Sequence, residues 1–359
     1  MKIVIATGGS GGHLFPALKV AEELRRKHCQ IHFWGSFKVG RESINKAGFS
    51  YEEIPLRGFN LGRWQDVPLS AWLMGKATIT SCGFLRKYDP DAVVGFGGYG
   101  AFPAMWAAVL LRYPTLIHEQ NVVPGRANAV LSRFVNKIAV SFPQTAGYPG
   151  MKGKSVVTGC PSHIPQQGMD RNGILEKFGL KADRKTILVL GGSQGSHRIN
   201  EEFIKTAEDL KRDIAFQVIH ITGKQDYDGL QTQYRQMGIP FVLFEFFEQM
   251  PQVYHVSDMI VSRAGAVTVT EIVRFQKPAV LIPYPHAGNH QKKNAQVLSE
   301  AGVGRLIEEK EIQPGALKEA ILSMLANPLS AERWERNFKN FSPGEAARRV
   351  AEEIMSLKG

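Results

Sequence analysis

Two glycine-rich segments constrain the possible folds of this chain more than any other feature. The first, Thr7-Gly8-Gly9-Ser10-Gly11-Gly12-His13, follows an apolar run at residues 3–6 and precedes an amphipathic helical pattern. The second, Gly191-Gly192-Ser193-Gln194-Gly195-Ser196-His197, follows residues 185–190 and also precedes a helical pattern. When a strand leads through a glycine-rich turn into a helix, the free backbone N–H groups and the positive end of the helix dipole point to one place. Phosphate commonly binds there. The Gly-Gly-Ser triplets start 183 residues apart, which indicates two similar halves.

The length and composition fit two domains. The 359 residues suffice for two domains, and a hydrophobic content of 43% suffices for a core in each. The first apolar run is too short for a signal peptide. Cys29, Cys82 and Cys160 are few and far apart, so we expect neither a disulfide framework nor a zinc site, and a reducing cytoplasm fits. Residues 92–111 are uncharged over the length of a membrane span, but their glycines and proline favour a strand, a turn and a buried helix.

Strand and helix patterns alternate along the whole chain. This alternation predicts an α/β fold of two Rossmann-like, doubly wound parallel-sheet domains. Turn residues cluster at 159–165, so we expect an N-terminal domain at 1–160 and a C-terminal domain at 161–342. A final helix at 343–359 follows a Ser-Pro-Gly break and is expected to pack back on the first domain. The expected strands are 3–6, 30–34, 92–96, 115–118 and 137–140 in the first half, and 186–190, 216–221, 259–261 and 279–283 in the second.

Positive charge is concentrated in the first half. Residues 1–160 contain 19 Lys+Arg and 9 Asp+Glu, whereas residues 161–359 contain 25 and 24. This asymmetry predicts an anionic partner for the first domain. There is no recognition-helix signature and no basic–aromatic stacking motif, so we expect an anionic membrane surface and no nucleic acid. Between residues 57 and 76, large apolar residues alternate with Arg57, Arg63 and Lys76, which suits the lipid headgroup boundary or, equally, a loop and helix packed on the core.

Neither glycine turn is a standard nucleotide fingerprint. The pattern GxGxxG fails at Leu14, and GxxxxGK[ST] is absent, which disfavours a dehydrogenase and an ATPase. The aspartate pairs at 89–91 and 226–228 resemble turn formers more than metal ligands. Polar clusters at other strand ends supply hydroxyls, amides and a carboxylate, which suit a sugar, while the glycine turns suit a diphosphate.

Glycosyl transfer requires a base for the acceptor hydroxyl and stabilisation of the leaving diphosphate. His13, at the first glycine turn, is a candidate base, and its alternative role is to cap its own helix. His118 and Glu119, at a strand end, are also plausible bases. Ser193 and the amides around it could hold a diphosphate without a metal, and the alternative for Ser193 is a simple N-cap.

These motifs together resemble the family of lipid-intermediate N-acetylglucosaminyltransferases of peptidoglycan synthesis, the MurG family. The resemblance covers nearly the whole chain, because its motifs follow one another in order from residue 8 to residue 295. The matching segments are Gly8-Gly9-Ser10-Gly11-Gly12-His13-Leu14-Phe15-Pro16-Ala17-Leu18, Gly97-Gly98-Tyr99, His118-Glu119-Gln120-Asn121, Gly191-Gly192-Ser193-Gln194-Gly195, Arg263-Ala264-Gly265-Ala266-Val267-Thr268, Glu271, His290-Gln291 and Asn294-Ala295.

The resemblance implies a B-type glycosyltransferase fold, with two domains that face a cleft, and an inverting reaction that needs no metal and no cofactor. The implied donor is UDP-N-acetylglucosamine, and the implied acceptor is undecaprenyl-pyrophosphoryl-N-acetylmuramyl-pentapeptide at the cytoplasmic face of the membrane, where the protein would be peripheral. By position, the resemblance implies that the first domain contacts the donor through Ser10, Gly11, Gly12 and Asn121. In the second domain it implies Ser193 at the diphosphate, Phe247 by the uracil and Gln291 at the sugar hydroxyls. The residues implied around the ribose and sugar are Ala266, Val267, Thr268, Val269, Thr270 and Glu271.

One position departs from the family pattern. Where the family has an arginine that could meet the donor phosphate, this chain has His163, which carries charge only at lower pH.

Three other functions are alternatives to this transferase. They are a diacylglycerol glycosyltransferase of the same fold, a UDP-sugar 2-epimerase, and a non-catalytic UDP-sugar-binding subunit that recruits partners to the membrane. An epimerase needs carboxylates beside the sugar, and the first domain offers only Glu119 at a strand end.

Overall fold

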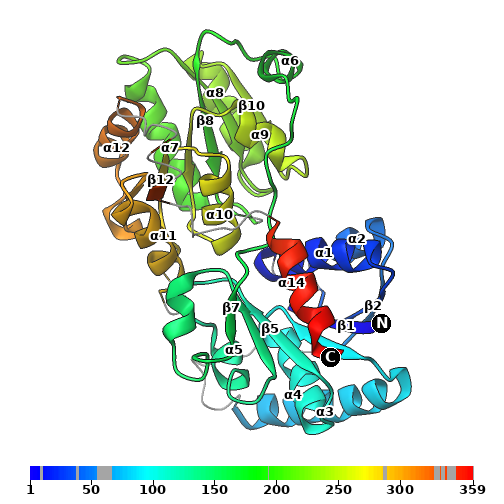
Figure 1. Ribbon diagram of the computed structural model, residues 1–359. Helices are drawn as coiled ribbons and strands as arrows, with labels where there is room; N and C mark the ends of the chain where they lie inside the picture. The colour runs from blue at the N-terminus through cyan, green and yellow to red at the C-terminus, as the bar shows by residue number, and fades with distance from the viewer. Residues whose placement is uncertain are drawn as a thin grey trace. The chain divides into compact units, whose positions relative to one another are not determined.

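The chain forms two compact units. The computed structural model describes residues 1–8, 11–37, 40–54, 67–192, 194–285, 289–326, 332, 336–337 and 345–358. Unit 1 comprises Met1–Ser162 together with Asn340–Gly359, and unit 2 comprises His163–Lys339. Each unit contains a parallel sheet flanked by helices (Figure 1), so the α/β fold of two parallel sheets is confirmed.

Unit 1 is built on a seven-stranded sheet of order β3-β2-β1-β4-β5-β6-β7, in which every described pairing is parallel. Alternate residues of β1 face opposite sides, because side chains along a strand alternate. Ile3 and Ile5 pack with α1 and α14, whereas Val4 and Ala6 pack with α3, α4 and α5. The elements are β1 (Lys2–Thr7), α1 (Gly11–Arg26), β2 (Gln30–Gly35), α2 (Arg41–Lys46), β3 (Ser50–Glu53), α3 (Val67–Tyr88), β4 (Ala92–Gly95), η2 (Tyr99–Ala101), α4 (Phe102–Leu110), β5 (Thr115–Glu119), α5 (Arg126–Leu131), β6 (Lys137–Val140), η3 (Pro143–Gly147), β7 (Ser155–Val157), α14 (Ala346–Met355) and η5 (Ser356–Lys358).

Unit 2 repeats this plan with a six-stranded sheet of order β10-β9-β8-β11-β12-β13. Ile187 and Val189 of β8 pack with α7, α8 and α12 in one continuous core. The elements are α6 (Arg171–Lys177), β8 (Lys185–Leu190), α7 (His197–Leu210), β9 (Phe216–Ile221), α8 (Tyr227–Met237), β10 (Phe241–Phe244), α9 (Met250–Val256), β11 (Met259–Ser262), α10 (Ala266–Arg274), β12 (Ala279–Leu281), α11 (His290–Glu300), β13 (Gly304–Leu306), η4 (Glu309–Glu311) and α12 (Pro314–Ala326).

The strand order of each sheet reverses at one place. In unit 1 the reversal lies between β1 and β4, and in unit 2 it lies between β8 and β11. Crossovers leave such a point in opposite directions, which opens a crevice at the carboxyl ends of the two strands, where ligands bind in doubly wound sheets. Both glycine-rich turns of the sequence begin at these points.

The C-terminal helix belongs to unit 1. α14 lies beside α1 (Figure 1), and its buried residues Val350, Ala351 and Ile354 join the core around Ile3 and Ile5. The uncharged stretch 92–111 contains β4, η2 and α4, as the sequence predicts. Among the described residues, no helix combines the length and hydropathy needed to cross a bilayer.

Among the described residues, one histidine is completely buried in each unit, His118 in unit 1 and His220 in unit 2. His220 on β9 lies 3.0 Å from the Tyr234 hydroxyl through Nδ1 and 3.0 Å from Asn200 Oδ1 through Nε2. Burial lowers the pKa of His220 to about 3 and that of His118 on β5 to about 4, because the charged imidazolium loses its hydration. Both rings are therefore neutral at physiological pH.

The packing of α14 leads to a first prediction. Replacing Ile354 by alanine removes a fully buried side chain and should lower the free energy of unfolding by about 2–4 kcal/mol. The neighbouring Met355 is 37% exposed, so Met355→Ala should cost less than about 1 kcal/mol. Urea denaturation of both variants measures this difference, and equal losses would show that the buried face of α14 does not stabilise unit 1.

The buried histidines predict a loss of stability in acid. Between pH 6.5 and pH 4 an unfolded histidine takes up a proton that folded His118 excludes, so the unfolded state binds more protons and gains stability as the pH falls. At pH 5 we expect about 2 kcal/mol of destabilisation for each buried histidine relative to pH 7. His220→Gln keeps an amide in place of the ring and should remove the contribution of unit 2. A pH-independent urea midpoint in the wild type would contradict this expectation.

Candidate functional site

Two backbone turns meet at the strand-order reversal of unit 1. The Gly8 N–H donates to the Gly97 carbonyl at 3.1 Å. A Cβ atom on Gly98 would lie 3.1 Å from Cα of Gly8, and Gly97 and Gly98 adopt φ angles of +84° and +78°. The contact is tighter than most Cβ contacts and the φ angles are strained for residues with a side chain, so glycine is favoured at Gly97 and Gly98. The close approach places the start of α1, with Gly11 and Gly12, beside the end of β4.

A hydrogen-bonded chain of side chains lies behind this turn. Nδ1 of His13, in the first turn of α1, is 3.1 Å from Oε1 of Gln120. Gln120 Nε2 contacts the Phe96 carbonyl at 2.8 Å and Nδ1 of His118 at 3.1 Å. His118 Nε2 contacts the Gly159 carbonyl at 3.1 Å. His118 is fully buried with both nitrogens occupied, whereas His13 is partly exposed.

Glu119 organises the loop after β5. Its buried Oε1 accepts from the backbone N–H of Asn121 at 2.9 Å and from Asn121 Nδ2 at 3.1 Å. Oε2 accepts from the backbone N–H of Gly125 at 3.0 Å and from Asn128 Nδ2 at 2.8 Å. Four donors therefore surround this carboxylate, and it holds Asn121 at the carboxyl edge of the sheet.

The second glycine turn joins β8 to α7 at the strand-order reversal of unit 2. Gly192 and Gly195 have φ angles of +93° and +79°, and a Cβ on Gly195 would lie 2.2 Å from the Thr222 carbonyl oxygen. Ser196 occupies the N-cap of α7, so the first backbone N–H groups of this 14-residue helix face the turn. Ser10 and Ser193, which the resemblance assigns to the donor, lie outside the described residues.

A buried arginine braces the second turn. Arg263 follows β11 directly, is 8% exposed, and donates from Nη2 to Ser196 Oγ at 2.7 Å. Its Nη1 donates to the Ile282 and Pro283 carbonyls at 3.2 and 3.3 Å, and the guanidinium pairs with Glu309. The side chain thus ties the ends of β8, β11 and β12 together and places a guanidinium, paired with Glu309, beside the N-terminus of α7.

Residues 266–271 form the first turns of α10. Val267 and Thr268 are partly exposed, whereas Ala266, Val269, Thr270 and Glu271 are buried. Thr270 donates its hydroxyl back to the Ala266 carbonyl at 2.9 Å. The exposed part of this segment is therefore its N-terminal turn, where the backbone N–H groups have no partner within the helix.

His163 and Glu271 contact each other. Glu271 Oε1 lies 2.7 Å from Nδ1 of His163 and accepts from the His163 backbone N–H at 3.2 Å. Only 5% of the Glu271 side chain is exposed. The residue that departs from the family pattern therefore hydrogen-bonds the carboxylate that the resemblance assigns to the ribose.

Gln291 and Phe247 complete the set in unit 2. Gln291 Oε1, at the start of α11, accepts from the backbone N–H groups of Ala264 and Tyr284 at 3.1 and 3.0 Å, which leaves its NH₂ group as a donor. Phe247 follows β10 and packs with Phe178 and Phe244, at centroid distances of 5.9 and 4.4 Å.

The structure adds two residues to which sequence reasoning gave no role, although both lie in matching motifs. Gln120 links His13 to His118, and Arg263 links the second glycine turn to the end of β12. Each follows a buried strand directly, and polar residues in that position could have indicated them. His13 is 107 residues from Gln120, and Ser196 is 67 residues from Arg263, so these contacts could be found only from the fold.

Both halves of the chain match models of one family. Residues 3–140 match the glycosyltransferase family 28 N-terminal domain, and residues 186–351 match the glycosyltransferase family 28 C-terminal domain. A protein of Bacillus cytotoxicus named UDP-N-acetylglucosamine–N-acetylmuramyl-(pentapeptide) pyrophosphoryl-undecaprenol N-acetylglucosamine transferase is 34% identical, and the match covers 99% of each chain. The protein of that name from Thermodesulfovibrio yellowstonii is 35% identical, also over 99% of each chain.

A solved structure agrees with these relatives. The crystal structure of MurG from Acinetobacter baumannii matches with a TM-score of 0.77 and 28% identity, over 99% of both chains. The matches to both family domains, the full-length relatives and the strand-order reversal in each sheet all indicate the same family. The chain belongs to glycosyltransferase family 28, among the UDP-N-acetylglucosamine–N-acetylmuramyl-(pentapeptide) pyrophosphoryl-undecaprenol N-acetylglucosamine transferases.

Proposed function

We propose that this chain transfers N-acetylglucosamine from UDP-N-acetylglucosamine to the C4 hydroxyl of undecaprenyl-pyrophosphoryl-N-acetylmuramyl-pentapeptide, with inversion and without a metal. The observation that carries the proposal is the site in unit 2, where an anion-binding helix start adjoins polar groups suited to a ribose and a sugar. Family membership supplies the donor and the acceptor. In this proposal unit 2 binds the donor, and unit 1 receives the acceptor.

The donor half of the mechanism uses fixed dipoles. The N-terminus of α7 and the turn containing Ser193 hold the diphosphate, and the guanidinium of Arg263 keeps that turn in place. These groups stabilise the negative charge that develops on UDP as the glycosidic bond breaks. Glu271, oriented by His163, accepts from the ribose hydroxyls, and the NH₂ group of Gln291 donates to the sugar.

The acceptor half needs one base. His13 Nε2 takes the proton of the C4 hydroxyl while the hydroxyl oxygen attacks the anomeric carbon, and the bond from that carbon to UDP breaks on the opposite side. His13 is favoured over the two other candidates because it is partly exposed. His118 is fully buried, and the carboxylate of Glu119 is surrounded by four donors.

A stripe on α3 supports contact with an anionic membrane, which would place the protein at the cytoplasmic face as a peripheral protein. Its residues are exposed and recur at steps of three and four, so they share one helix face. Trp72 and Ile79 are 62% and 74% exposed, and Lys76 Nζ lies 5.5 Å from the Trp72 ring centroid. The stripe consists of Leu69, Trp72, Lys76, Ile79, Gly83 and Arg86.

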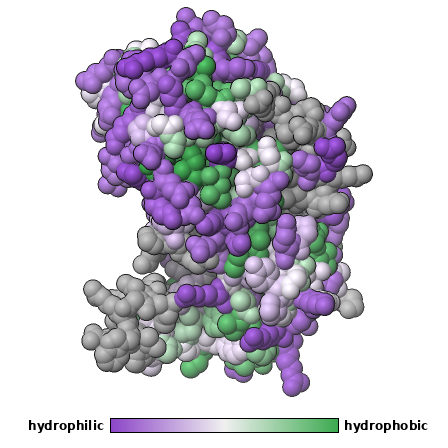
Figure 2. Space-filling view, turned by 90° about the vertical axis from the view of Figure 1, so that its left-hand side faces the viewer, coloured by the Kyte–Doolittle hydropathy of each residue, from purple (hydrophilic) through white to green (hydrophobic). Residues whose placement is uncertain are grey.

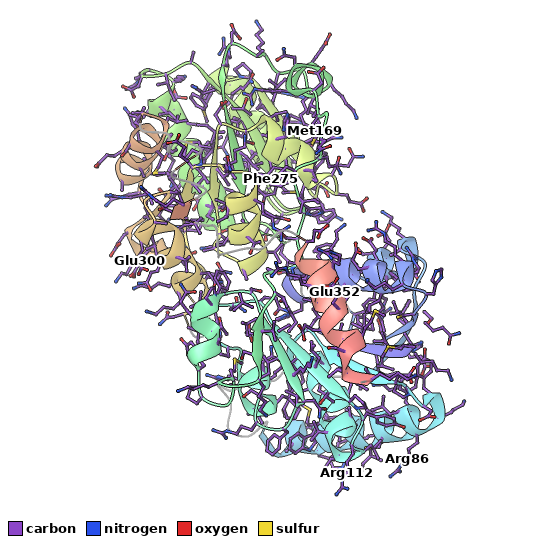
Figure 3. The ribbon with its side chains drawn as sticks, viewed as in Figure 1. Arg86, Arg112, Met169, Phe275, Glu300 and Glu352 are labelled. Carbon is purple, nitrogen blue, oxygen red and sulfur yellow. The ribbon has the colours of Figure 1, made fainter. Side chains whose placement is uncertain are left out.

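A further cation, Arg112, lies near the C-terminal end of the stripe. Arg86 at the end of α3 and Arg112 just after α4 point outward at the same end of unit 1 (Figure 3). By contrast, the face of unit 2 in the upper part of Figure 2 is mostly hydrophilic. Exposed apolar groups among cations suit the headgroup region of an anionic bilayer. Residues 57–66, which belong to the same apolar and basic stretch of the sequence, lie outside the described residues.

Transfer of labelled sugar to a short-chain analogue of the muramyl-pentapeptide lipid, with a chelator present, tests the proposed reaction. We expect transfer by the wild type and a fall in kcat of about 10²- to 10⁴-fold in His13→Ala, because the general base is lost. Lys19→Ala on the same helix, which removes only a surface ion pair with Glu22, should retain activity. Tight UDP binding without transfer to this lipid would overturn the acceptor assignment, and transfer to diacylglycerol instead would identify the alternative enzyme.

Sedimentation with vesicles containing anionic phospholipid tests the membrane surface. The double variant Trp72→Glu and Ile79→Glu should bind at least about tenfold more weakly, because it loses apolar insertion and gains repulsion. Val156→Glu changes an exposed apolar residue of β7 and serves as the control. Wild-type binding should weaken as salt is added. Equal binding by all three proteins would show that α3 does not contact lipid.

A further inference from the structure

We propose that Gln120 and His118 act as positioning residues that hold His13 in the tautomer with its proton on Nδ1, so that Nε2 is the free basic nitrogen. This inference rests on the proposed function, in which His13 accepts the proton of the acceptor hydroxyl. It follows from the order of donors and acceptors in the buried chain of contacts that ends at His13.

The orientation of the Gln120 amide is fixed by the backbone. One end of the amide lies 2.8 Å from the Phe96 carbonyl oxygen, which can only accept a hydrogen bond, so that end must be the NH₂ group. The other end, Oε1, is therefore the atom that faces His13 at 3.1 Å. Gln120 is 2% exposed, so a flipped amide would leave buried groups without partners.

The tautomer of His118 follows from the same reasoning. Its Nε2 lies 3.1 Å from the Gly159 carbonyl oxygen and must carry a proton to form that hydrogen bond. Burial keeps the ring neutral, with a pKa of about 4, so Nδ1 has no proton and accepts from Gln120 Nε2 at 3.1 Å. His118 thus provides a second, independent reason for the amide orientation.

The state of His13 is the consequence. Gln120 Oε1 is an acceptor, so the His13 nitrogen that faces it, Nδ1, carries the proton of the neutral ring. The lone pair then lies on Nε2. A neutral amide sets this tautomer without placing a negative charge beside the imidazole, unlike the carboxylate that orients histidine in a Ser-His-Asp triad.

Gly97 and Gly98 restrict the orientation of the His13 ring. A Cβ on Gly97 would lie 3.3 Å from Cε1 and Nδ1 of His13, and one on Gly98 would lie 3.1 Å from Cδ2. The imidazole therefore packs against backbone on two of its edges. The absence of side chains at Gly97 and Gly98 makes room for the ring in the orientation that Gln120 selects.

Nitrogen NMR of the full chain with ¹⁵N-labelled histidine tests the tautomer without any assay of activity, and comparison with His13→Ala assigns the ring signals. We expect wild-type His13 to show a protonated Nδ1 and an unprotonated Nε2 at neutral pH. In Gln120→Leu we expect a mixture of tautomers and a kcat about 10- to 100-fold lower, with the KM for UDP-N-acetylglucosamine changed less than about threefold.

Thr115→Val is the matched control. Thr115 is a buried residue of β5, the strand that leads to Gln120, and it hydrogen-bonds Asn136 at 2.9 Å. This variant should change neither the tautomer of His13 nor kcat, even if it lowers stability. A loss of kcat in Gln120→Leu that Thr115→Val reproduces would overturn the proposal.

The wild-type spectrum decides the proposal even if Gln120→Leu fails to fold. A wild-type His13 protonated on Nε2 would overturn the positioning role while leaving the transferase function intact. If wild-type His13 has the expected tautomer but the protein transfers no sugar, the positioning by Gln120 and His118 would be supported and the proposed reaction would be overturned. The two inferences can therefore fail separately.

Discussion

The site in unit 1 depends on the contact between two stretches of bare backbone. Gly8 approaches Gly97 and Gly98 so closely that a Cβ on Gly98 would lie only 3.1 Å from Gly8 Cα and would push the two backbone segments apart. This contact places the start of α1 against the end of β4. It also creates the space that the imidazole of His13 occupies, and so it places that ring within reach of Gln120. Glycine at positions 97 and 98 therefore favours the hydrogen-bonded chain that begins at His13.

The second half of the chain repeats the turn but stabilises it differently. There, Gly195 approaches the Thr222 carbonyl just after β9, and Asn200, which contacts the neutral ring of His220, donates to the same carbonyl at 2.9 Å. The difference between the halves is a buried guanidinium, that of Arg263, which pairs with Glu309 and binds Ser196 and the backbone after β12.

The sequence predicted the interior of both sheets and missed their edges. Every strand with a neighbour on each side was expected within one or two residues of its observed bounds. The strands that escaped notice, β3, β7, β10 and β13, are the edges of the two sheets. Edge strands are short and only partly buried. The strands β3, β7 and β13 also contain polar residues or glycine, so they lack the continuous apolar run that identifies a central parallel strand. The strand β10 is apolar throughout but has only four residues.

The site shows the same limit at the level of side chains. Strand ends and glycine turns indicated where the polar residues gather. The sequence could not rank His13, His118 and Glu119, because the ranking depends on burial and on hydrogen bonds such as that between Nδ1 of His13 and Oε1 of Gln120, 107 positions away. Likewise, the contact of His163 with Glu271 joins residues that are 108 positions apart.

The packing of α14 on unit 1 also affects the order in which the two units fold during synthesis. Val350, Ala351 and Ile354 cover α1, yet they follow unit 2 in the chain. During synthesis unit 1 therefore waits with the apolar stripe of α1 uncovered until the ribosome has finished unit 2. Unit 2 is continuous in sequence and has no such delay, so it can complete its core before the unit that was synthesised ahead of it.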